Sequence, residues 1–265
     1  MPITTISTSR RATVTSLLAA AFLLTAAGCA ETPPGASNTS NALLTVTMTV
    51  DGVIDPNCYY FVLFNPTPTS SPSTGPIPAL AEPWGGNGFA TGSFTAFLEC
   101  NPTQGNGTGY GMWAALNNST NVTTASFGPA AVPIQFTTWS TSTQIQFEIP
   151  LSEIPGATSN AYLSINFIAT NSLPTAQESG NTTKLYDALG DGRMVSQINS
   201  FITVPATQAE GYNNNTGLEP KGDVMEVGDG LGDGVNVQDG TTSGPDNTPV
   251  SDVDIINWSV QVTPE

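Results

Sequence analysis

The sequence predicts an all-β fold, an antiparallel β-sandwich of jelly-roll or immunoglobulin-like type with long loops rich in glycine and proline. Many short segments alternate apolar and polar residues or are apolar throughout, and 26 glycines and 21 prolines supply turns, many of them between such segments. Helical signal is scarce: residues 182–189 could form one or two turns, and residues 193–204 fit either a strand or a short helix. We expect residues 42–265 to form a single domain.

The pattern of apolar residues predicts each strand in turn. Residues 44–50 alternate apolar side chains with threonines, which is typical of a strand with one buried face. Residues 58–64 are apolar on both faces, which indicates a central strand covered on two sides. Further strands are expected at residues 93–100, 109–116, 132–139, 143–149 and 161–170, and a closing strand at residues 254–262 with Ile256, Trp258, Val260 and Val262 on one face.

Residues 65–92 form a long connection rich in proline and glycine, and connections of that length are often functional. Trp84 lies in its glycine-rich part, where no strand pattern competes for the side chain, so it is our candidate for contact with a ligand or partner. Other aromatic candidates for stacking on a sugar ring are Trp113, Trp139, Trp258, Tyr59, Tyr60 and Tyr110. Of these, Trp139 and Trp258 lie in strand patterns, which favours the core for both.

The first 28 residues resemble the signal peptide of a bacterial lipoprotein. Arg10 and Arg11 form a basic start, residues 14–27 form a short apolar region, and small residues precede Cys29. The resemblance implies cleavage before Cys29 and attachment of lipid to that cysteine. The protein would then be exported and anchored by lipid to the bacterial cell membrane or outer membrane, with its body outside the cytoplasm. Residues 29–41 are expected to be a flexible tether, since they offer almost nothing to bury.

Other readings of this N-terminal segment remain open. An uncleaved transmembrane anchor is disfavoured because threonines and a serine interrupt the apolar run, and a span needs about 20 apolar residues. Cleavage at an ordinary signal-peptidase site would leave Cys29 as a thiol near the new N-terminus in an oxidising compartment. Residues 9–11 also resemble the start of a twin-arginine signal, but Thr13 and Val14 replace its usual bulky apolar pair, which favours the general secretory route.

Acidic residues dominate the charge of the chain, with 21 acidic and five basic residues and a formal charge of −16. Removal of the first 28 residues takes two arginines with it, so the charge becomes −18 and the basic residues that remain are Lys184, Arg193 and Lys221. Such a chain has almost nothing with which to neutralise phosphates, so nucleic-acid binding is excluded. Attachment to anionic lipid through a basic patch is disfavoured for the same reason, which leaves the lipid anchor as the membrane contact.

The chain contains no histidine. This excludes Ser-His and Cys-His nucleophile pairs, histidine metal ligands and imidazole proton shuttles, so we expect a protein that is not an enzyme. One enzyme class stays open, because a glycosidase needs only two facing carboxyl groups about 5 to 10 Å apart. The glutamates nearest to the apolar strands are Glu82, Glu99, Glu148 and Glu153.

Two cysteines remain when Cys29 is lipidated. In an exported chain, Cys58 and Cys100 are expected to form a disulfide. Cys58 opens one apolar strand and Cys100 closes the next, so antiparallel pairing would bring the two ends together. Closing this loop would stabilise the fold by about 4 kcal/mol on the chain-entropy estimate.

The densest acidic stretch is a loop rich in glycine and aspartate at about residues 210–252. Asp229, Asp233 and Asp239 alternate with glycines there, a pattern that resembles a calcium-binding loop and makes Ca²⁺ the one candidate cofactor. The match is partial, because Leu231 stands where a ligand oxygen is needed and Gly240 stands where the bidentate acid belongs. A solvated acidic loop without metal is therefore the alternative.

Four segments follow one another in an order that resembles the DOMON-like and family-nine-like carbohydrate-binding sandwiches: residues 50–55, 59–64, 147–152 and 163–167. The resemblance implies a two-sheet sandwich that binds sugar or haem, and it carries over no binding residues. Haem is disfavoured because the usual methionine and histidine axial pair lacks its histidine.

Together these observations predict a non-catalytic cell-envelope lipoprotein whose sandwich binds glycan or another surface component. The first alternative is a structural or assembly lipoprotein that binds a protein partner through residues 65–92. The second is the carboxylate-dependent glycosidase.

Overall fold

The computed structural model describes eight segments of the chain: residues 42–79, 86–101, 109–116, 125–136, 142–174, 184–189, 201–213 and 248–263. These segments belong to one compact unit, residues 37–265. Several residues singled out above lie outside the described segments, namely the expected signal peptide and tether with Cys29, and Trp84, Trp139, Asp229, Asp233 and Asp239.

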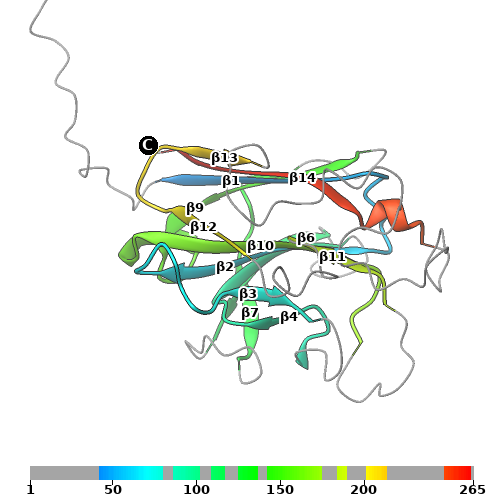
Figure 1. Ribbon diagram of the computed structural model, residues 1–265, viewed down its shortest axis with the longest axis horizontal. Coiled ribbons are helices and arrows are strands. Elements are labelled where there is room, and N and C mark those ends of the chain that lie inside the picture. Colours follow the sequence, from blue (N-terminus) through cyan, green and yellow to red (C-terminus); the bar gives the residue numbers. More distant parts are fainter. Residues whose placement is uncertain are drawn as a thin grey trace, which may run out of the picture. The chain divides into compact units, whose positions relative to one another are not determined.

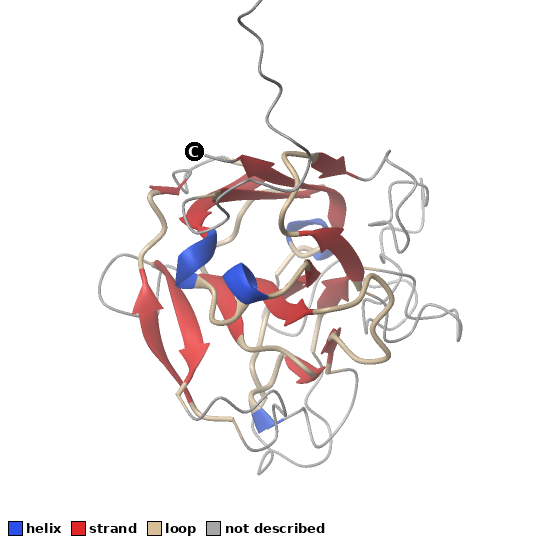
Figure 2. Ribbon diagram, turned by 90° about the vertical axis from the view of Figure 1, so that its left-hand side faces the viewer, coloured by secondary structure: helices blue, strands red, loops and turns tan. Residues whose placement is uncertain are grey.

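The described strands form two large antiparallel sheets and a small hairpin, and the two sheets face each other as layers (Figure 1). Sheet A has the order β13 (Gly211–Asn213), β14 (Ile255–Thr263), β1 (Leu43–Val50), β9 (Gln144–Pro150), β8 (Gln135–Phe136). Sheet B has the order β11 (Tyr186–Ala188), β10 (Tyr162–Thr170), β2 (Tyr59–Thr67), β5 (Ala96–Cys100), β6 (Tyr110–Ala115), β7 (Phe127–Ala131), and β12 (Ile202–Pro205) also pairs with β10. The hairpin consists of β3 (Pro76–Pro78) and β4 (Ala90–Gly92), and short 3-10 helices, blue in Figure 2, include η3 (Leu151–Glu153), η4 (Ala157–Ser159) and η5 (Val250–Asp252). The predicted all-β sandwich is confirmed.

The main hydrophobic core lies between the two sheets. Because side chains alternate across a strand, every second residue of β1 points into this core. Four residues of β1 do so, each at most 1% exposed: Leu44, Val46, Met48 and Val50. Trp258 of β14 reaches across the core and stacks on Phe167 of β10, with ring centroids 5.9 Å apart. The predicted half-buried first strand and the core position of Trp258 are therefore confirmed.

β2 is the central strand of sheet B, as its two apolar faces predict. It lies between β10 and β5 and is buried on both sides. Its inner face joins the main core, and its outer face carries Phe61 and Leu63 into a second apolar cluster on the far side of sheet B. The hairpin covers this outer cluster, since Phe89 next to β4 stacks on Phe61 with ring centroids 4.0 Å apart.

The connection at residues 65–92 has more structure than expected. β2 continues to Thr67, and the two strands of the hairpin lie at residues 76–78 and 90–92. Asn166 of β10 donates a hydrogen bond of 3.0 Å from Nδ2 to the carbonyl oxygen of Pro76, which attaches the hairpin to the sheet. Proline and glycine in this segment indicated a loop, whereas contact with the apolar outer face of sheet B orders it.

Two other predicted elements differ from the structure, and one strand of the structure was not predicted. Residues 132–139 do not begin as a strand, because Pro133 has no amide hydrogen to donate, and β8 starts only after Val132 and Ile134, which are 62% and 61% exposed. β7, ending at Ala131, was not anticipated. Residues 186–188 form strand β11 rather than a helical turn. For residues 193–204, the strand prediction is confirmed at residues 202–204, which belong to β12.

The closing strand contains one local irregularity. The register between β1 and β14 shifts at Thr49 and Val50, so that Val50 faces Ile255. Ile255 is therefore fully buried, while Ile256 is only half-buried. The predicted buried face holds for Trp258 and the two valines that follow it, and is wrong for Ile256 because a bulge displaces side chains by one position.

The predicted disulfide is not formed in the structure. Cys58 and Cys100 are both fully buried in the main core, and no disulfide joins them. The register explains this, because Cys100 stands opposite Tyr60, two residues beyond Cys58 along the chain. Burial, with a smaller contribution from Glu99, raises the pKa of the Cys100 thiol, which makes it a weak nucleophile.

Candidate functional site

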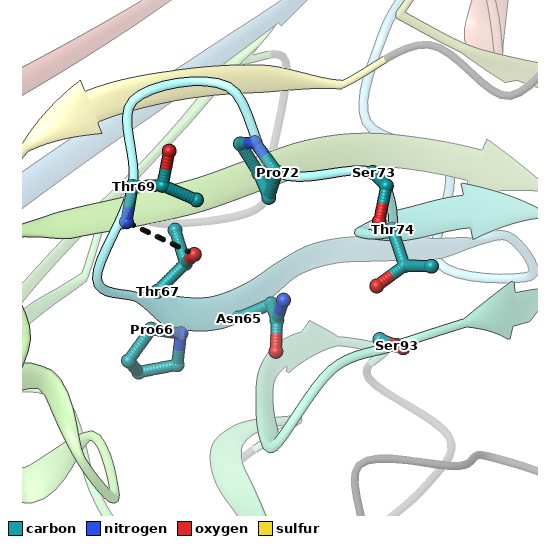
Figure 3. A pocket seen from close by; sticks show the side chains of 8 residues that line it. All are labelled: Asn65, Pro66, Thr67, Thr69, Pro72, Ser73, Thr74 and Ser93. Atoms are coloured by element: carbon teal, nitrogen blue, oxygen red, sulfur yellow. Dashed lines mark hydrogen bonds between the residues drawn. The ribbon is translucent and has the colours of Figure 1, made fainter.

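An open pocket of about 330 Å³ lies at the end of β2, between that strand and the chain that leads to the hairpin (Figure 3). Its lining is almost entirely hydroxyl, amide and proline: Asn65, Pro66, Thr67, Thr69, Pro72, Ser73, Thr74 and Ser93. Seven of these eight residues come from the stretch that directly follows the apolar part of β2, and Ser93 comes from the end of the hairpin. The pocket is therefore made by the hairpin folding back onto the strand that precedes it.

Asn65 is the central residue of this pocket. It is only 7% exposed, and its carboxamide points into the space between Thr67, Thr74 and Ser93 in Figure 3. Within the described part of the chain, the structure records no hydrogen bond of this carboxamide. The carboxamide opens onto the cavity and is not sealed in the core, so its donors and its acceptor are available to an external polar group.

The hydroxyl groups around Asn65 are also available to a ligand. Thr67 is 5% exposed, and the bond that its Oγ1 makes is a long one of 3.5 Å, accepted from the amide of Thr69. For the side chains of Ser73 and Thr74 the structure records no hydrogen bond within the described residues. Hydroxyl groups both donate and accept, so this lining suits a ligand that carries many groups of the same kind.

Backbone geometry at the hairpin fixes the far wall of the pocket. Gly92 has φ +78, and a Cβ there would collide with the carbonyl oxygen of Gly75. This close approach lets Ser93 donate a backbone hydrogen bond of 2.9 Å to the same oxygen. Only glycine fits this conformation without strain, so residue 92 determines where the Ser93 hydroxyl lies.

Lys184 holds the other end of the hairpin in place. It is fully buried, and its Nζ donates hydrogen bonds of 2.6 Å to the carbonyl oxygen of Gly88 and 3.4 Å to that of Ala79. The ammonium group also lies 5.4 Å from the centre of the Tyr186 ring. Burial lowers the pKa of Lys184 to about 7. Lys184, one of the few basic residues of the chain, thus connects the hairpin to β11.

Glu99 lies beside the outer aromatic cluster. It projects from β5 beside Phe97, whose ring stacks on that of Trp113 with centroids 6.4 Å apart. Desolvation raises the pKa of Glu99 to about 6, and the nearby indole N–H of Trp113 offsets part of this rise. Even so, Trp113 Nε1 is buried without a hydrogen-bonding partner. Trp113 is half-buried and packs against the outer apolar cluster.

Two buried aspartates serve as acceptors for backbone amides. Asp187 accepts hydrogen bonds of 2.6 Å from Ile255 and 2.8 Å from Ala188, which ties β11 to the start of β14. Asp252 accepts one of 3.0 Å from Val53, and desolvation raises its pKa. Such contacts are typical of carboxylates that hold loops together. Among the described residues, no group of three or more acidic or cysteine side chains could hold a metal ion.

The glutamates considered for glycoside hydrolysis are not brought together where they are described. Glu99 projects from the outer face of sheet B, and Glu148 projects from β9 on the outer face of sheet A. Glu153 is exposed in η3, and Glu82 lies outside the described residues. The outer faces of two stacked sheets point in opposite directions, so Glu99 and Glu148 cannot act on one bond.

The pocket residues were not singled out in the sequence, although the connection that carries seven of the eight was. A usable signal was present: residues 65–74 combine hydroxyl residues with prolines directly after a wholly apolar strand. Trp84, the candidate from the same connection, lies outside the described residues.

No described helix has the length and apolar character needed to cross a membrane. Comparisons of the chain with protein-family models, with curated proteins and with solved structures found no match. The chemistry of the pocket is therefore the basis on which a function can be assigned.

Proposed function

We propose that this protein is a non-catalytic lipoprotein of the bacterial cell envelope that binds glycan in the pocket around Asn65. The observation that carries the proposal is the Asn65 side chain: the residue is only 7% exposed, and its carboxamide faces an open cavity with no recorded hydrogen bond to the described residues. A sugar carries several hydroxyl groups that both donate and accept, so it can satisfy the amide and the surrounding threonine and serine hydroxyls at once.

The size and polarity of the pocket support the same ligand class. A cavity of about 330 Å³ lies at the small end of the range for small-molecule sites. Its apolar contribution comes from two proline rings, Pro66 and Pro72, and its described lining holds no large aliphatic side chain. A lipid-like ligand would leave the polar lining without partners, whereas one or two sugar rings would not.

A glycan array followed by calorimetry tests this proposal. Asn65→Ala should weaken the retained glycan about tenfold or more, because two buried hydrogen bonds are lost. The variant should stay folded, since the carboxamide makes no recorded hydrogen bond within the described protein. Thr45→Ala on the outer face of β1 is the matched control and should leave affinity unchanged. A folded protein that retains no glycan, or an Asn65→Ala variant that binds as tightly as the wild type, contradicts the proposal.

The anchor is a second part of the proposal. Lipid attached to Cys29 would hold the sandwich outside the cytoplasm, on residues 29–41 as a tether. Globomycin, which inhibits the lipoprotein signal peptidase, should block maturation, and Cys29→Ser should move the protein from the detergent phase to the aqueous phase. Unchanged maturation and partitioning would exclude the anchor. The calcium loop of Asp229, Asp233 and Asp239 stays a prediction, which an unchanged melting temperature after addition of a chelator would exclude.

One observation favours the assembly role as a second candidate function. Three large apolar side chains are 61% to 70% exposed: Leu116 directly after β6, and Val132 and Ile134 between β7, the edge strand of sheet B, and β8, the edge strand of sheet A. Exposed apolar side chains that form a contiguous patch are typical of protein contacts. Under this alternative, a pull-down from envelope extract recovers one partner protein in stoichiometric amount, and the wild-type protein binds no glycan. The Ile134→Ser variant should no longer recover that partner.

A further inference from the structure

We propose that the pocket around Asn65 selects neutral saccharides and rejects those that carry carboxylate, sulfate or phosphate groups. This inference rests on the proposed glycan binding and specifies its ligand class. It depends on three features of the site: the charge of its lining, the state of its backbone amides and the charge of the whole protein.

The pocket offers no cation to an anionic sugar. Its lining residues are all uncharged. Lys184 is the one basic residue in the described part of the chain, and its ammonium group is buried against the carbonyl oxygen of Gly88. Recognition of carboxylate, sulfate or phosphate usually depends on arginine, lysine or clustered backbone N–H groups.

Three backbone amides at or beside the pocket already donate hydrogen bonds within the protein. Thr69 donates its amide to Thr67 Oγ1 at 3.5 Å, and Ser71 donates its amide to Thr69 Oγ1 at 3.3 Å. On the opposite wall, Ser93 donates to the carbonyl oxygen of Gly75 at 2.9 Å. Local turns and the hairpin contact thus occupy three amides that could have served an anion, and the side-chain donors of the pocket are uncharged hydroxyl groups and one carboxamide.

The charge of the whole protein adds a penalty for anions. Without its first 28 residues the chain carries a formal charge of −18. Spread over a sphere of about 22 Å radius, that charge disfavours each additional negative charge at the surface by about 25-fold at 0.01 M salt and about fivefold at 0.15 M. A neutral sugar has no charge for the protein to repel, so its affinity should not depend on salt concentration.

Matched pairs of saccharides test the inference. Each neutral glycan retained on the array is compared by calorimetry with the same glycan after oxidation of its C6 hydroxyl groups to carboxylates. The oxidised form should bind at least tenfold more weakly at 0.01 M salt, and the difference should narrow at 0.15 M. A general loss of shape complementarity would give a difference that salt does not change.

A pair of lysine variants separates local charge from net charge. Ser71→Lys places a cation at the exposed rim of the pocket, and Asn257→Lys places one on the exposed part of β14 in sheet A. Both change the net charge by one unit. Ser71→Lys should strengthen binding of the oxidised glycan by about threefold at 0.01 M salt, more than Asn257→Lys does, with neutral binding unchanged in both.

The outcomes separate this inference from the function on which it rests. If neutral glycans bind and the oxidised forms bind equally well or more tightly, the selectivity is wrong and glycan binding stands. A salt-independent difference between the two forms also overturns it. If neither form binds, glycan binding itself is refuted, and the selectivity with it.

Discussion

Replacing Glu99 by glutamine should stabilise the protein at neutral pH and leave it unchanged in acid. Glu99 projects from β5 into the neighbourhood of the outer aromatic cluster, close to Trp113. Desolvation raises its pKa from the usual 4.5 to about 6. The folded protein therefore holds this proton to a higher pH than the unfolded chain does.

The sign and size of the effect follow from this difference. Between the unfolded pKa and the folded pKa of about 6, the folded state binds more protons, so the stability that Glu99 contributes is complete below pH 4.5 and is lost as pH rises through 6. A shift of about 1.5 pKa units corresponds to about 2 kcal/mol, and partial exposure of the side chain reduces it toward about 1 kcal/mol. Glutamine has nearly the shape of the protonated acid and never becomes charged.

Urea unfolding followed by tryptophan fluorescence at pH 4 and pH 7.5 measures this difference. Glu99→Gln should raise the free energy of unfolding by about 1–2 kcal/mol at pH 7.5 and by nearly zero at pH 4. Glu148→Gln on the outer face of β9 controls for the loss of one negative charge from an acidic protein. The reasoning is refuted if Glu99→Gln stabilises equally at both pH values, or if Glu148→Gln gives the same difference.

Two further predictions concern the loop between β1 and β2, and urea unfolding measures both. Gly52→Ala should cost about 1–3 kcal/mol, because the new Cβ would collide with Asp252 Oδ1, whereas Gly111→Ala has open space around it and should change stability by less than about 0.5 kcal/mol. Tyr60→Phe should cost about 1–3 kcal/mol, since the hydroxyl donates to the Asp252 carbonyl oxygen and accepts from the amide of Asp55, both at 2.8 Å. Equal effects of the two alanine variants, or a Tyr60→Phe variant as stable as the wild type, would show that these contacts are misassigned.

Much of the fold could be predicted from local patterns. The alternation in residues 44–50 gives β1 with its buried face, and the two-sided apolar run at residues 58–64 gives the central strand of sheet B. These predictions succeed because the period of a strand is a property of the backbone, and burial of apolar side chains follows it. Predictions that depended on how strands pair were less successful, as Ile256 and the expected Cys58–Cys100 disulfide show.

The candidate site could be predicted only as a region. The proline-rich connection at residues 65–92 drew attention by its length, but Trp84 was chosen from it rather than Asn65. Nothing local distinguishes Asn65 from the other asparagines in an asparagine-rich chain. Its importance comes from its 7% exposure and from the cavity that the folded hairpin leaves in front of it.

By itself, the sequence determined the all-β class, the strands of the core and the absence of histidine chemistry, because these depend on residue types and on spacing within single segments. The tertiary structure alone decided that Ser93 lies across a cavity from Asn65, and that Glu99 lies beside Trp113. Such juxtapositions depend on register and on hairpin closure, which are set by the packing of distant side chains rather than by any one segment.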